Sequence, residues 1–208
     1  MSTESSSNAE PTPLIVVVSG PSGVGKDTLL ERMEETHSDL NFHFVVTATT
    51  RLPREGERDG INHLFLSRTQ FEMLLEDNQL LEHAEIYGNY YGVPRRQVAR
   101  SLEEGKHVIL RVDYQGAERI RAIVPEALFV FVMPPDKETL RTRLIARGQD
   151  TPKSIERRMA SADHEMEVGM TFDYQITNRD GQLDELVEEL VQIIETESRR
   201  DPPRQMGL

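Results

Sequence analysis

The segment LIVVVSGPSGVGKDTLLERMEET, residues 14–36, decides the fold. It opens with a continuous apolar run, Leu14–Ser19, of the kind that forms a strand buried on both faces. Glycine-rich residues follow, and apolar residues then recur at the spacing of one helical face. The segment therefore predicts a strand, a tight loop and a helix over Lys26–Thr36, which together open an α/β unit.

The same alternation of strands and helices continues through the second half of the chain. Apolar runs predict strands at His107–Asp113, Ala127–Met133 and Tyr174–Thr177. Helical periodicity and cap residues predict helices at Pro94–Glu104, Ala117–Val124, Asp136–Ala146, about Pro152–Met166, and Gln182–Ser198. This alternation predicts an α/β fold with a parallel sheet flanked by helices.

The rest of the chain divides by composition. Residues from about 42 to 93 break the alternation with short β-like pieces, turns and a helix from about Thr69 to Glu76, so we expect an α+β insert. Residues 1–13 are rich in Ser, Pro and acids, which predicts a disordered tail before one domain at 14–198. Residues 199–208 are expected to form a C-terminal tail.

Composition excludes several classes of function. The 208 residues carry a net charge of −12, which argues against broad binding to nucleic acid or to a membrane surface. Because the chain has no Cys, it has no disulfides, thiolate metal sites or Cys nucleophiles. No apolar run reaches the roughly 18 residues of a membrane span, and the first residues do not resemble a signal peptide. We expect a cytoplasmic protein.

The loop GPSGVGK, Gly20–Lys26, matches the pattern GxxxxGK directly between the predicted strand and helix. Its glycines let backbone N–H groups turn toward phosphate oxygens, and the helix N-terminus adds partial positive charge. Lys26 is expected to reach the β- and γ-phosphates of a nucleoside triphosphate. The predicted ATP-binding residues are Gly20, Pro21, Ser22, Gly23, Val24, Gly25, Lys26, Asp27 and Thr28.

One position departs from this pattern. Where Ser or Thr normally follows the lysine to hold Mg²⁺, the chain has Asp27, with Thr28 next. The Asp27 carboxylate could face the metal directly or through water. Alternatively, Thr28 supplies the hydroxyl and Asp27 only interacts with the helix dipole. Both residues are candidate metal ligands.

Further arginines predict a second phosphate site. Arg51 and Arg54 lie three residues apart in TTRLPRE, where a proline stiffens the loop between them. Arg143, Arg147 and Arg158 lie in a second basic stretch of the otherwise acidic chain. Transfer of a phosphoryl group between two phosphates requires such cations, so the pattern favours a kinase with a phosphorylated acceptor over a hydrolase.

Five segments in this order resemble guanylate kinases over about Leu14–Glu197: GPSGVGK, TTRLPRE, LLEHAEIYGNYYG, RVDYQGA and RLIARGQD. The resemblance implies a P-loop nucleoside-monophosphate kinase fold with a core, a GMP-binding insert and a helical lid at about residues 147–166. It implies ATP + GMP = ADP + GDP by direct in-line transfer with Mg²⁺, in purine metabolism and GMP recycling, with dGMP as a possible acceptor.

The resemblance also implies roles for individual residues. Catalytic roles fall on Lys26, Arg51, Arg143, Arg147 and Arg158, and GMP-binding roles on Thr47, Arg51, Arg54, His63, Glu82, Tyr91 and Asp113. Four of the family's usual residues are replaced, by Thr47, His63, Val93 and Arg111. The last of these replaces an aspartate and reverses a charge near the site.

Alternatives remain for two residues and for the function. Asp113 could cap the helix that follows it, and Glu82 could be a surface acid of the insert. A non-catalytic binding module of the same fold is the alternative function, but the intact loop glycines and Lys26 argue for an enzyme. Another P-loop kinase would not explain Glu82, Asp113 and NYYG together.

Overall fold

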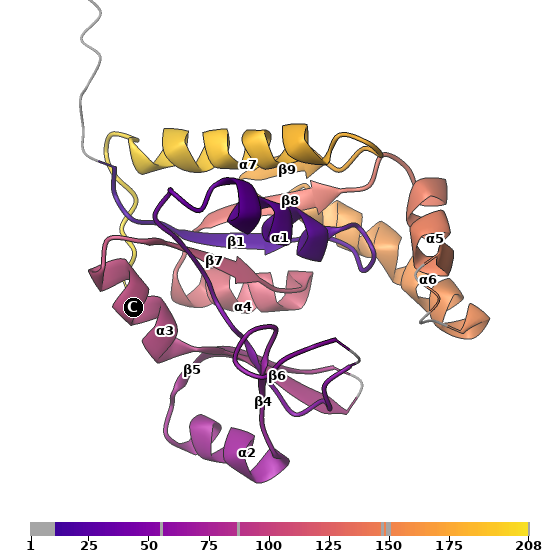
Figure 1. Cartoon of the computed structure of the whole chain (residues 1–208), viewed down its shortest axis with the longest axis horizontal. Coiled ribbons are helices and arrows are strands. Elements are labelled where there is room, and N and C mark those ends of the chain that lie inside the picture. Colours follow the sequence, from indigo (N-terminus) through magenta and orange to yellow (C-terminus); the bar gives the residue numbers. More distant parts are fainter. Residues whose placement is uncertain (1–10, 55, 87, 147, 149–150, 208) are drawn as a thin grey trace, which may run out of the picture.

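The computed structural model describes residues 11–54, 56–86, 88–146, 148 and 151–207. Its central sheet has five parallel strands, shown in Figure 1. Their order is β2 (Phe42–Phe44), β7 (His107–Arg111), β1 (Ile15–Ser19), β8 (Leu128–Met133) and β9 (Tyr174–Thr177). The parallel sheet confirms the predicted α/β class.

Helices cover both faces of this sheet (Figure 1). One face is covered by α1 (Lys26–Thr36) and α7 (Leu183–Ser198), which pack on each other. The other face is covered by α3 (Arg95–Glu103), α4 (Tyr114–Ile123) and the C-terminal end of α6 (Pro152–Gly169). α5 (Lys137–Ala146) packs against α6 beyond the carboxyl ends of the strands. None of the helices in the described ranges is long and apolar enough to cross a membrane.

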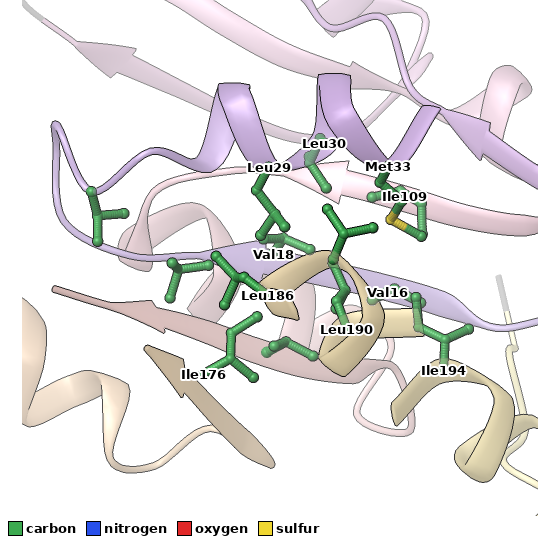
Figure 2. Packing of buried hydrophobic residues seen from close by; sticks show 14 of the residues in the cluster. Val16, Val18, Leu29, Leu30, Met33, Ile109, Ile176, Leu186, Leu190 and Ile194 are labelled. Atoms are coloured by element: carbon green, nitrogen blue, oxygen red, sulfur yellow. The ribbon is translucent and has the colours of Figure 1, made fainter. Parts of the chain in front are cut away.

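The core explains why the first strand reads as an uninterrupted apolar run. Side chains of β1 alternate between two core clusters, with Val16 and Val18 on one face and Ile15 and Val17 on the other. Figure 2 shows the first cluster, where residues of α1 and α7 meet β1. The contacting side chains labelled there include Leu29, Leu30, Met33, Leu186, Leu190 and Ile194. Because every residue of β1 is buried, its sequence does not alternate between apolar and polar residues.

A second sheet forms the predicted insert. Its order is β4 (Leu64–Phe65), β3 (Ala48–Thr49), β6 (Asn89–Pro94) and β5 (Leu80–Ile86), with α2 (Arg68–Glu76) beside it. The expected start at residue 42 is wrong, because β2 pairs with β7 and packs its phenylalanines on the main core. The β5–β6 hairpin was not predicted as strands.

Two predicted boundaries near the cleft also differ. β7 ends at Arg111 rather than Asp113, and α4 begins at Tyr114 rather than Ala117. The cause is a helix cap: Asp113 Oδ1 accepts a hydrogen bond from the N–H of Gly116 at 2.8 Å. α6 is longer than predicted and ends at Gly169. The other predicted elements of the central domain agree with the structure to within one residue.

The first described residues contact the C-terminus of α7, and residues after α7 pack on the domain. The N–H of Thr12 donates to the carbonyl of Ser198 at 2.8 Å, while residues 1–10 lie outside the described part. Arg204 is largely buried and donates from Nε to Glu197 at 2.7 Å. Met206 packs against both core clusters. The described part of the C-terminal tail is therefore packed on the domain.

Replacing Leu190 by Ala tests this packing. Leu190 is fully buried where α7 meets the sheet, so Leu190→Ala should lower the free energy of unfolding by about 2–5 kcal/mol. Leu52→Ala is the matched control, because Leu52 is 82% exposed, and its effect should stay within about 0.5 kcal/mol. Urea denaturation measures both, and equal losses would contradict the assigned core.

Candidate functional site

The carboxyl ends of β1, β7 and β9 open into a cleft of about 1240 Å³. The insert closes one side of it, and α5 and α6 close another. Ligands of open parallel sheets bind at this edge, where loops and helix N-termini converge. The predicted site residues that line the cleft are Gly20, Ser22, Gly23, Gly25, Lys26, Asp27, Thr28, Thr47, Arg51, Arg54, His63, Glu82, Tyr91, Asp113, Arg143 and Arg158.

The loop between β1 and α1 has the backbone that a phosphate site requires. Gly23 and Gly25 have φ angles of 87° and 99°, which residues with a Cβ rarely adopt. Lys26 Nζ folds back on this loop and donates to the carbonyls of Gly20 and Pro21, at 2.5 and 3.2 Å. Burial lowers the pKa of Lys26. The lysine is thus directed at the place where the loop would hold phosphate oxygens.

Two residues from later in the chain fix this loop: Arg143, which the sequence predicted as a catalytic residue, and Asn178, which it did not predict. Asn178, directly after β9, donates from Nδ2 to the Val24 carbonyl at 2.7 Å. Arg143 donates to the same carbonyl at 3.2 Å and forms an ion pair with Asp180. Pro21 and Val24, which were predicted to bind ATP, are buried and are not among the residues that line the cleft. The sequence signal that could have indicated Asn178 is the polar segment Asn178–Asp180, which directly follows a predicted strand.

On the insert side, one carboxylate organises both predicted phosphate arginines. Arg51 donates from Nη1 and Nη2 to the two oxygens of Glu57, at 2.8 and 2.9 Å. The backbone N–H of Arg54 donates to Glu57 at 2.7 Å. Hydrogen bonds to Arg51 chiefly lower the pKa of Glu57, to about 2. The carboxylate also supports Arg51 beside Tyr91, whose hydroxyl further raises the pKa of Arg51.

His63 lies in the same wall. Its Nδ1 is 2.8 Å from the hydroxyl of Thr47, and its ring packs edge-on against Tyr91. Burial lowers the pKa of His63, and the charges of Arg111 and Arg51 lower it further. These shifts favour a neutral imidazole in this structure, with one ring nitrogen available as a hydrogen-bond donor or acceptor.

Glu82 is a buried acid, not a surface one. It is 6% exposed on β5, and its Oε1 accepts from Arg119 Nε of α4 at 2.7 Å. Burial raises the pKa of Glu82, while Arg119 opposes the shift and the nearby Asp113 adds to it. Asp113 caps α4, which confirms that interpretation, and it also lines the cleft, where guanine binding stays a prediction. Arg119 was not predicted, because its contact with Glu82 joins two elements across the fold.

Helix α6, which covers most of the predicted lid, places a cation on the loop between β1 and α1. Arg158 of α6 donates to the hydroxyl of Ser22. Arg147 lies outside the described residues. Glu165, also on α6, lines the cleft and was not predicted. Burial raises the pKa of Glu165, and the charge of Lys26 opposes that shift.

The residues beside Lys26 offer few metal ligands. Within the described residues, no three His, Cys, Asp or Glu side chains lie close enough together to hold a metal ion. Asp27 Oδ1 instead accepts from Arg111 Nη1 at 2.7 Å, and Thr28 lies exposed at the cleft. This donor set fits Mg²⁺ that is bound mainly by nucleotide phosphates and water, which is how Mg²⁺ commonly binds in kinases.

Comparisons with known proteins point to one family. The guanylate kinase family model matches residues 12–197. A guanylate kinase of Thiobacillus denitrificans is 41% identical over 94% of this chain and 93% of its own length. One from Halalkalibacterium halodurans is 44% identical over 82% of each chain. A crystal structure of guanylate kinase from Anaplasma phagocytophilum has a TM-score of 0.75 at 30% identity, over 94% of this chain and 91% of that one.

The Glu57–Arg51 pair predicts a pH effect on stability. The pKa of Glu57 is about 2 in the folded state against an ordinary 4.5, so the unfolded state binds more protons between these values. Its contribution is complete above about pH 4.5 and is lost as the pH falls through 2. Glu57→Gln should therefore make the loss of stability between pH 5 and 3 less steep. Glu76→Gln, an exposed acid of the same insert, is the control. A Glu57→Gln slope identical to the parent's would refute the pair.

Proposed function

The chain belongs to the guanylate kinase family and is a phosphotransferase. On this premise we propose that it transfers the γ-phosphoryl group of ATP in line to the phosphate of GMP, with the site residues in the roles given below. The observation that carries the proposal is that one cleft holds the P-loop lysine, Lys26, together with the arginine pair of the insert, Arg51 and Arg54.

Each phosphate has its own set of cations in this proposal. The triphosphate of ATP takes the place of the loop carbonyls that Lys26 now contacts, within about 3 Å of its ammonium group. The GMP phosphate binds Arg51 and Arg54, with Tyr91 and His63 as further hydrogen-bonding partners. Glu57 holds Arg51 in place before GMP arrives, which reduces the ordering that binding requires.

The transfer needs no covalent enzyme intermediate. An oxygen of the GMP phosphate attacks the γ-phosphorus while the bond to the β–γ bridging oxygen breaks, which yields GDP and ADP. Lys26, Arg51, Arg143, Arg147 and Arg158 neutralise the charge on the oxygens around the reacting phosphorus. Asp27 or Thr28 would lie nearest to Mg²⁺, which would neutralise part of the phosphate charge when it is bound with ATP.

Guanine recognition is assigned to Glu82. Guanine presents N1–H and a 2-amino group side by side, and a carboxylate accepts such a pair with its two oxygens. Arg119 binds Oε1 of Glu82 and favours the ionised form that this recognition needs. Asp113 and Thr47 line the same part of the cleft and complete the proposed base site.

We extend the proposal to the setting of the reaction. GMP and ATP are small cytoplasmic metabolites, so a role in purine nucleotide metabolism and GMP recycling in the cytoplasm follows from the substrates. dGMP is included as an acceptor, because no contact proposed here depends on the 2′-hydroxyl of the ribose.

A coupled assay of ADP release with GMP, dGMP, AMP, CMP and UMP tests the proposed function. We expect rapid turnover with GMP, measurable turnover with dGMP, and rates lower by factors on the order of 10⁴ with AMP. Lys26→Ala should lose most of the turnover while the fold is retained, because its ammonium acts on the transition state. A non-catalytic binding module would bind GMP in calorimetry and release no ADP.

Glu82→Gln tests guanine recognition. Because hydrogen bonds to a charged group contribute about 1.5–3 kcal/mol, kcat/KM for GMP should fall roughly 10- to 150-fold while KM for ATP changes little. Glu85→Gln is the control, since Glu85 is exposed on the same strand outside the cleft lining. GMP phosphorylation by Glu82→Gln at the parent's rate, or a parent preference for AMP, would show that Glu82 does not select the base.

A further inference from the structure

One ion pair joins two of the positions where the sequence departs from expectation. Asp27 stands where the P-loop pattern has a hydroxyl residue, and Arg111 stands where the resemblance implied an aspartate. The structure pairs them across 84 positions of sequence, with Arg111 Nη1 2.7 Å from Asp27 Oδ1. The two replacements therefore bring opposite charges into contact.

The location of Arg111 is central to the cleft. It is the last residue of β7 and pairs in register with Val18 of β1, one residue before β1 ends and the P-loop follows. Its side chain lines the cleft, as do Lys26 and His63. Burial lowers the pKa of both Lys26 and His63, and the charge of Arg111 lowers both further. The guanidinium thus lies within electrostatic reach of the ATP side and of the GMP side.

Fold stability does not explain this pair well. The side chains of Arg111 and Asp27 are 32% and 54% exposed, and ion pairs this accessible to water contribute little to stability. Among the described residues, Asp27 is the one side chain that accepts a hydrogen bond from the guanidinium of Arg111. A guanidinium group has five N–H donors, so most of the donors of Arg111 remain available to an anionic ligand in the cleft.

We propose that Arg111 is an additional catalytic residue, whose guanidinium contacts the phosphoryl group in transfer between ATP and GMP. Asp27 is then a positioning residue for Arg111 and not a ligand of Mg²⁺. This inference rests on the proposed guanylate kinase reaction. It adds a cation to the lining of the cleft, at a position where neither the P-loop pattern nor the family resemblance predicted one.

The step keeps its balance of atoms and charge. The γ-phosphorus forms a bond to a GMP phosphate oxygen and loses its bond to the bridging oxygen, whose electron pair leaves with ADP. Arg111 stays protonated throughout and donates hydrogen bonds to the equatorial oxygens of the transferred group. Asp27 holds the guanidinium group of Arg111, so the phosphates meet a preorganised cation and not a freely rotating side chain.

Steady-state kinetics of Arg111→Gln, Arg111→Lys, Asp27→Asn and the double variant test this proposal. Arg111→Gln should lower kcat by about 30-fold or more with less than about threefold change in KM for GMP or ATP, because the contact strengthens in the transition state. Arg111→Lys should recover only part of kcat, since lysine lacks the fork. Asp27→Asn should cost about 3- to 10-fold in kcat but nothing further in the Arg111→Gln background, because Asp27 acts through Arg111.

Arg32→Gln is the matched control. Arg32 also forms a 2.7 Å ion pair from α1, with Asp184, but outside the cleft, and its loss should leave kcat unchanged. A binding measurement complements the kinetics: the affinity for a bisubstrate analogue, adenosine and guanosine joined by five phosphates, should fall at least 10-fold in Arg111→Gln and stay constant in Arg32→Gln.

Three results would overturn the inference. The first is a kcat for Arg111→Gln within twofold of an active parent. The second is a loss of kcat in the double variant that equals the product of the losses in the two single variants. The third is a several-fold weaker dependence of ATP binding on Mg²⁺ in Asp27→Asn, measured by calorimetry, which would make Asp27 a metal ligand. A parent that does not phosphorylate GMP would instead refute the proposed function.

Discussion

Two phosphorylated ligands must meet in one cleft of a chain whose net charge is −12, so local positive charge is the constraint on which the structure depends. Some of the arginines that line the cleft are held by acids. Arg51 is held by Glu57, and Arg143 by Asp180. These acids fix the orientation of the guanidinium groups in advance, which is how a preorganised site stabilises charge without reorganising during the reaction.

The parallel sheet makes this concentration of charge possible. The carboxyl ends of its strands lie at one edge, so residues distant in sequence are brought to the same loop. The P-loop follows β1, Arg111 ends β7, and Asn178 follows β9. The buried contact from Asn178 to the Val24 carbonyl ties the first and last of these to each other. The insert then supplies the proposed second phosphate site and, from a separate sheet, the buried acid Glu82.

Local patterns predicted what local sequence determines. The P-loop and its flanking strand were predicted, and α1 was predicted with the bounds that the structure shows. Glycine spacing and apolar periodicity act over a few residues, so local sequence is enough to predict them. Residue patterns also predicted the phosphate-binding loop and the arginines, whereas the roles of Thr47, His63, Glu82 and Tyr91 came from a resemblance to whole motifs. The partners of those residues could not be predicted in this way: Arg119 lies 37 positions from Glu82, and Asn178 lies 154 from Val24. Such pairs depend on tertiary packing, as does the assignment of β2 to the central sheet.

A crystal structure of the parent with GMP and a non-hydrolysable ATP analogue tests the central claim most directly. The account predicts the GMP phosphate on Arg51 and Arg54, the γ-phosphate on Lys26, and an oxygen of GMP about 3–3.5 Å from the γ-phosphorus in line with the bridging oxygen. A GMP phosphate bound away from Arg51, or the two nucleotides held too far apart for direct transfer, would contradict it.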